Sequence, residues 1–137
     1  MQGSPPDDLN GFFAFLVIPP APPFPEHLYL KKMCGVVWSY SGPMEKAEEV
    51  FKPIREFRKP AVDLAGPLPH HVLQGMFDAF YPAGLQWYWR ADFVKELSDA
   101  AIKEHVKFGN ALPTMLSTMH LYPVNGAASK VGKKDTA

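Results

Sequence analysis

Apolar residues recur along the chain in short alternating runs and in longer helical stripes. Runs of period two that are rich in aromatic residues and bounded by proline or glycine predict strands. Strands are expected at Gly11–Ile18, His27–Tyr40, Pro60–Gly66, Leu85–Arg90 and Thr114–Tyr122. Aromatic strands that alternate with helices of moderate length predict an α+β fold, a mainly antiparallel sheet with helices packed on one face.

The first helix is expected from Pro43, since proline suits the first helical position. Its apolar positions recur at helical spacing between Met44 and Phe57. Acidic residues come first and basic residues follow, which matches the helix dipole. Because proline removes a backbone donor, Pro53 predicts a kink or a break near Glu49.

Two further helices are expected. One follows Pro69, and the other follows Ser98, whose hydroxyl suits an N-cap. Phe51, Trp87 and Trp89 are expected to be largely buried where the sheet meets the helices.

Composition limits the class of protein. The chain has 137 residues, of which 47% are hydrophobic, so it suits a single domain over 1–137. Fourteen basic residues balance fourteen acidic ones, which argues against nucleic acid and against an anionic membrane as partners. The apolar run Phe12–Ile18 is too short to span a bilayer, and no basic leader precedes it. These features predict a cytoplasmic protein.

The proline-rich segment, the C-terminal residues, the single cysteine and the paired histidines each carry a further expectation. The proline-rich segment 19–25 is expected to be a stiff extended connection, and residues 126–137 to be a flexible tail. Cys34 is the single cysteine, which excludes an internal disulfide, and its apolar neighbours predict a small core residue. His70 and His71 are adjacent and point about 100° apart on a helix, so no metal site is expected.

Polar tips beside aromatic bodies mark two of the expected strands. Such a surface suits a flat small-molecule ligand. The side chains concerned are Gln86, Tyr88 and Arg90 on one strand and Thr118, His120 and Tyr122 on the other. The same alternation is also typical of the solvated face of a half-buried sheet, and the pattern alone leaves both interpretations open.

Four phrases in one continuous register carry a family resemblance. They are MEKAEEVFKPIREF (Met44–Phe57), AVDLAGPLP (Ala61–Pro69), LQWYWRADFVKELSDAAI (Leu85–Ile102) and LPTMLSTMHLYPVNGAA (Leu112–Ala128). With them, Pro43–Ala137 resembles bacterial FAD-linked oxidases of the berberine bridge enzyme-like type. Pro69-His70-His71 and Ser129-Lys130 depart from the family pattern.

The resemblance implies a fragment of a flavoprotein oxidoreductase. In that family one domain holds FAD, often through a histidine and a cysteine, and a substrate domain lays a sheet over the flavin. This chain resembles the substrate domain without the FAD-binding domain, so it is expected to bind FAD weakly or not at all when alone. In the whole enzyme, Tyr88 and His120 would be catalytic and take a proton from a small alcohol, sugar or phenolic. Gln86, Arg90, Thr118 and Tyr122 would bind the substrate.

Whether the chain alone is an enzyme stays open at this point, because other classes also fit. It could be a stand-alone α+β module that binds a small molecule or a metal ion without redox chemistry. A weaker alternative is a cofactor-free enzyme that uses Tyr88, Arg90 and His120. With no FAD-binding domain to cover it, the aromatic face is expected to pair with a second copy, which gives a homodimer.

Overall fold

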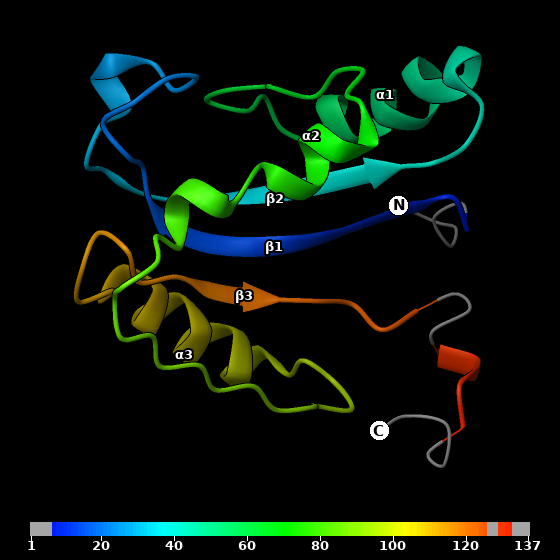
Figure 1. Cartoon of the computed structure of the whole chain (residues 1–137). Coiled ribbons are helices and arrows are strands. Elements are labelled where there is room, and N and C mark those ends of the chain that lie inside the picture. Colours follow the sequence, from blue (N-terminus) through cyan, green and yellow to red (C-terminus); the bar gives the residue numbers. More distant parts are fainter. Residues whose placement is uncertain (1–6, 126–128, 133–137) are drawn as a thin grey trace. The chain divides into compact units, whose positions relative to one another are not determined.

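A computed structural model describes residues 7–125 and 129–132 of the chain (Figure 1). The described part contains strands β1 (Leu9–Val17), β2 (Lys32–Tyr40) and β3 (Met119–Leu121), and helices α1 (Ala47–Phe57), α2 (His70–Gly75) and α3 (Asp99–Asn110). Short 3-10 helices are η1 (Glu26–Leu28), η2 (Met44–Lys46) and η3 (Asp78–Phe80). Strand β1 lies between β2 and β3 in an antiparallel sheet. The expected α+β class is therefore confirmed.

The chain divides into two compact units. The first comprises the described residues of Met1–Ala14, Cys34–Leu64 and His120–Ala137, and the second comprises Phe15–Met33 and Ala65–Met119. Parts of the expected tail, 126–128 and 133–137, lie outside the described residues. Across the described residues, no helix has the length and apolar character needed to cross a membrane.

The first unit joins α1 to the end of β2 through aromatic contacts. The rings of Tyr40 and Phe51 meet edge to face with centroids 6.4 Å apart, and the Arg55 guanidinium lies 5.7 Å from the Phe51 ring. Helix α1 follows η2 directly and continues through Pro53 to Phe57. Of the predicted kink or break near Glu49, the break is therefore wrong, since the helix is continuous from Ala47 to Phe57.

In the second unit, the proline-rich segment 19–25 forms a closed loop. The Ile18 N–H donates to the carbonyl of Lys31 at 2.9 Å, and the Leu30 N–H donates to the carbonyl of Ile18 at 2.8 Å. These bonds close a loop from Ile18 to Lys31, and turns at Pro19–Ala21 and Ala21–Phe24 bend the chain within it, so the segment is not the stiff extended connection that its composition suggests. Leu30 accommodates the closure with a φ of 60°.

Helix α3 of the second unit is fixed at both ends. The Ser98 hydroxyl accepts the Ala101 N–H at 3.2 Å, as the sequence predicts for an N-cap. At the other end, the Lys32 ammonium donates to the Asn110 carbonyl at 2.8 Å, where a cation complements the helix dipole. Gly109 lies against the Phe15 ring, and the His105 ring lies 5.4 Å from that of Phe15.

Two expected strands are absent, and two others are shorter than expected: the strand expected at His27–Tyr40 begins only at Lys32, after the 3-10 helix η1. Pro60–Gly66 and Leu85–Arg90 have no regular secondary structure, and only Met119–Leu121 of Thr114–Tyr122 forms a strand. Alternating side chains indicate an extended backbone, but a strand also needs a hydrogen-bonded neighbour. In Leu85–Arg90 that neighbour is missing among the described residues.

Few side chains of the described part are buried. The buried apolar residues are Leu9, Ala14, Val17, Ile18, Leu28 and Leu112. Phe51 and Trp87 are half-buried and Trp89 is 65% exposed, so the predicted core of these three aromatics is wrong. Cys34 is exposed on the edge strand β2, which also corrects its assignment to the core. For Cys34 the alternation was right for a strand, but its side chain is exposed on the sheet edge.

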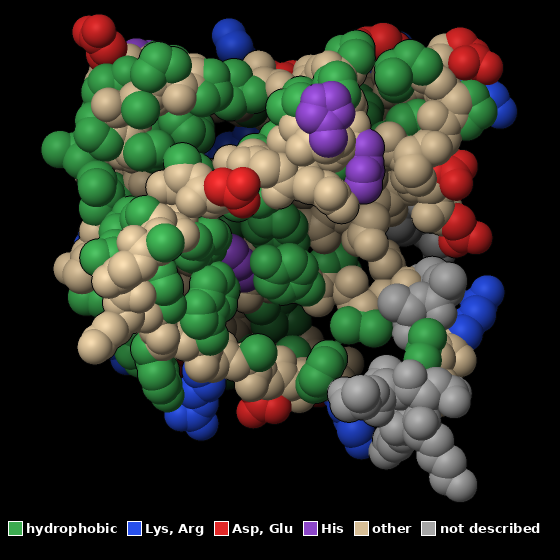
Figure 2. All heavy atoms as spheres, in the orientation of Figure 1, with side chains coloured by type: hydrophobic (Ala, Val, Ile, Leu, Met, Phe, Trp, Pro, Cys, Tyr) green, Lys and Arg blue, Asp and Glu red, His purple; other side chains and the backbone are tan. Residues whose placement is uncertain are grey.

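The accessible surface reflects this sparse burial. The chain exposes 11454 Å². A folded monomer of 15.3 kDa exposes about 7100 Å², so the excess is about 4300 Å². Hydrophobic side chains contribute much of the face seen in Figure 2. Many large hydrophobic side chains of the described part are exposed, among them Phe57, Phe93 and Val94.

Candidate functional site

Three aromatic side chains from β1 and the β3 region form a cluster in the first unit. The Nδ1 atom of His120 lies 2.9 Å from the hydroxyl oxygen of Tyr122. The Phe12 ring stacks on Tyr122 with centroids 4.8 Å apart and lies 5.2 Å from the His120 ring. His120 and Tyr122 therefore share one face of the sheet, as their spacing in the sequence predicts. We call Phe12, His120 and Tyr122 the aromatic triad.

Burial changes the pKa of the His120 imidazole in the aromatic triad. Burial lowers the pKa of His120 below its ordinary value of 6.5, so the ring is neutral at neutral pH. If Nδ1–H donates to the Tyr122 oxygen, Nε2 is a proton acceptor, and the other tautomer reverses these roles. Tyr122 is 62% exposed, so the triad is open to solvent. A half-buried neutral base beside a stacking ring suits acid–base chemistry on a small ligand.

The remaining predicted site residues belong to the second unit. Gln86, Tyr88 and Arg90 are exposed in the irregular segment, with Tyr88 at 87%. Thr118 is half-buried immediately before β3. The structure thus brings together His120 and Tyr122, whereas Tyr88 belongs to the other compact unit.

The side chains of the segment Leu85–Arg90 alternate between two sides, although the segment forms no strand. On one side, the Tyr81 ring contacts both tryptophans, with centroids 5.3 Å from Trp87 and 5.1 Å from Trp89. The Trp87 indole N–H donates to the Pro82 carbonyl at 3.4 Å. The intervening Tyr88 is the most exposed of these four aromatics. This pattern is that of an extended backbone with an aromatic side and a polar side.

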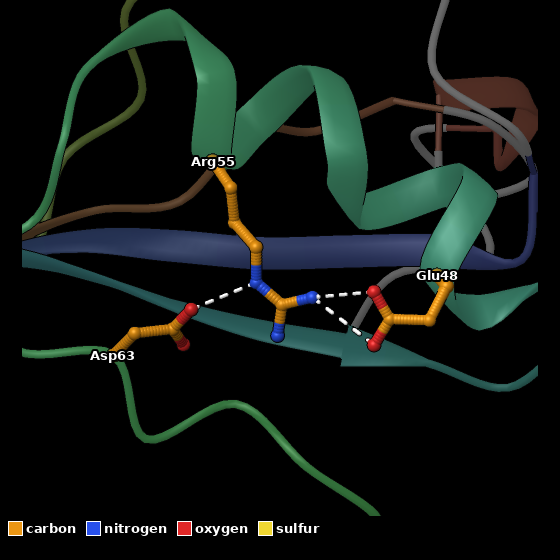
Figure 3. A network of polar contacts seen from close by, with 3 residues as sticks. All are labelled: Glu48, Arg55 and Asp63. Carbon is orange, nitrogen blue, oxygen red and sulfur yellow. Dashed lines mark hydrogen bonds and ion pairs between the residues drawn. The ribbon is translucent and has the colours of Figure 1, made fainter.

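A polar network that the sequence did not reveal lies along α1 (Figure 3). The Arg55 Nε donates to Asp63 at 2.7 Å, and its Nη1 donates to both carboxylate oxygens of Glu48, at 3.0 and 3.2 Å. These hydrogen bonds, first to Asp63 and then to Glu48, raise the pKa of Arg55. The guanidinium is committed to two carboxylates, so we assign it to holding the segment after α1 in place. The seven-residue spacing of Glu48 and Arg55, two helical turns, is the signal that sequence reasoning could have used.

The histidines of α2 do not extend into a metal site. His70 and His71 are both exposed, and Figure 2 shows histidine side chains on the surface over this helix. Among the residues that the structure describes, no three or more histidine, cysteine, aspartate or glutamate side chains gather to hold a metal ion.

The N-termini of α1 and α3 do not suit the pyrophosphate of FAD. Helix N-termini bind phosphate through free N–H groups and a positive dipole. The first turn of α1 carries Glu48 and Glu49, and that of α3 carries Asp99. These carboxylates repel a phosphate at either helix. Within the described part, β2 also lacks a glycine-rich phosphate loop after it, since Gly42 is followed at once by Pro43.

Comparison with known proteins adds no relative: no protein-family model matches the chain, and no curated protein matches it.

Proposed function

We propose that this chain is the substrate-side part of an FAD-linked oxidoreductase of the berberine bridge type, with FAD held by a separate domain or chain. The aromatic triad carries the proposal, because it places a neutral imidazole beside a stacking ring on an open sheet face. The exposed large hydrophobic side chains of the described part support it as well. The balanced charge and single cysteine favour a cytoplasmic location.

The residues of this chain have limited and definite roles in the proposal. The Phe12 ring stacks on a small phenolic, alcohol or sugar. His120 accepts the proton of the substrate hydroxyl at Nε2, while its Nδ1–H donates to Tyr122. Tyr88, Gln86, Arg90 and Thr118 belong to the other compact unit, so no role at the aromatic triad is assigned to them. The N-termini of α1 and α3 carry carboxylates that repel phosphate, which supports the proposal that this chain alone performs no flavin oxidation.

Isothermal titration calorimetry with phenol and with FAD as separate titrants tests this division of roles. Phenol should bind weakly, with a Kd of about 1 mM, as expected for so small a ligand. FAD should give no saturable heat. His120→Gln should weaken phenol binding, whereas His27→Gln, at an exposed position of η1, should leave it unchanged. Sub-micromolar FAD binding, or phenol binding that ignores His120, would overturn the proposal.

A further inference from the structure

The segment Leu85–Arg90 combines a strand sequence with an unpaired main chain. Its residues, LQWYWR, include three aromatics, which favour strands. From 82 to 97, the main chain makes no backbone hydrogen bond to any residue that the structure describes. An extended segment with free N–H and C=O groups is a template for another strand.

From this segment we infer a partner and a register: a second copy of this chain pairs with it, antiparallel about a two-fold axis at Tyr88. This inference does not depend on the proposed function. In that register Tyr88 lies opposite Tyr88 of the second copy, Trp87 lies opposite Trp89, and Gln86 lies opposite Arg90.

The alternation of the segment makes this register self-complementary. Directly opposite residues of an antiparallel pair share one face of the sheet. The tryptophans of both copies, which contact Tyr81 within each chain, then fall on one face. Gln86, Tyr88 and Arg90 of both copies fall on the other face, where glutamine opposes arginine and no like charges meet. A shift by one residue would place each tryptophan opposite a polar or phenolic side chain.

The exposed area supports a second copy as the occupant. A stable interface buries about 800 Å² on each partner. The segment and its neighbours offer large exposed side chains to such an interface. The exposed side chains of Tyr88 (87%), Trp89 (65%) and Phe93 (90%) lie in or beside the segment.

Cysteine cross-linking tests the register directly. The background is Cys34→Ser, because the native thiol is exposed. In the proposed register the two Tyr88 Cα atoms are about 4.5–5.5 Å apart, within reach of a disulfide. The two Gln86 Cα atoms are roughly 14 Å apart, beyond that reach. Tyr88→Cys should therefore give mostly covalent dimer under mild oxidation, while the matched control Gln86→Cys should stay mostly uncross-linked.

Two further measurements test the pairing of the two copies and its register. The double variant Gln86→Cys/Arg90→Cys should restore cross-linking, because these positions face each other across the pair. Light scattering on the unmodified chain should give the mass of a dimer at high micromolar concentration. A monomeric mass would overturn the inference, and so would equal cross-linking of Tyr88→Cys and Gln86→Cys, which indicates random collision.

Discussion

Gly109 of α3 lies directly against the phenyl ring of Phe15, so that a side chain at position 109 would overlap the ring. This contact predicts an unusual response to substitution. Glycine to alanine within a helix normally stabilises by about 0.5–1 kcal/mol. Here Gly109→Ala should destabilise by about 1–3 kcal/mol in urea unfolding, because the core must shift to admit the methyl group.

Two variants control this prediction. Gly35→Ala lies in open space on β2, and its effect should stay within about 0.5 kcal/mol. Phe15→Leu combined with Gly109→Ala should recover part of the loss. Equal effects of the two alanine variants would show that α3 does not pack on Phe15.

The N-cap of α3 gives a second prediction. Ser98→Ala removes the acceptor of the Ala101 N–H and should cost about 1 kcal/mol in urea unfolding. Ser98→Asp keeps an acceptor and adds a favourable charge at the helix N-terminus, so it should retain the stability. A similar loss in both variants would argue against the cap.

The order of core substitutions gives a third prediction. Ile18 is 5% exposed, whereas the larger Phe51 is half-buried. Ile18→Ala should lower the free energy of unfolding by about 2–5 kcal/mol. Phe51→Ala should lower it by only about 1–2 kcal/mol, because folding removes less of the Phe51 side-chain area from water. Paired urea melts test the order. A greater loss at Phe51 would indicate a deeper core around α1 than the structure shows.

The pH dependence of stability gives a fourth prediction. Burial lowers the pKa of His105 and of His120 in the folded chain. Protons therefore bind the unfolded chain more readily, and stability is present above the ordinary histidine pKa of 6.5 and lost as pH falls below it. The free energy of unfolding should be lower at about pH 5.5 than at about pH 7.5. His120→Gln should reduce this difference, while His27→Gln, for which the structure shows an exposed ring, serves as the control. A slope that His120→Gln leaves unchanged would contradict the assignment.

Local signals in the sequence were reliable guides to local structure. The serine before Asp99 predicted the cap of α3, and the apolar run from Gly11 predicted β1, because both depend on neighbouring residues. The apolar stripe between Met44 and Phe57 predicts α1, and this helix continues through Pro53. One missing donor does not end a helix whose remaining hydrogen bonds are intact.

What the sequence could not supply were non-local partners. Leu85–Arg90 alternates like a strand, yet strand formation depends on a neighbour that alternation does not specify. The same reason explains the exposed Cys34 and Trp89, whose burial requires a covering layer. For the candidate site, spacing placed His120 and Tyr122 on one face. The Phe12 ring completes the triad from β1, which precedes His120 by over a hundred residues in the sequence. No sequence motif predicts this contact.

The most direct test of the proposed substrate face is an NMR titration of the chain with phenol, followed at the imidazole C2–H of His120. The proposal predicts a saturable shift of this signal, with Tyr122 and Phe12 resonances moving in parallel and the His27 signal unchanged. A His120 signal that does not move while phenol shifts resonances elsewhere would contradict the assignment of the aromatic triad as the substrate site.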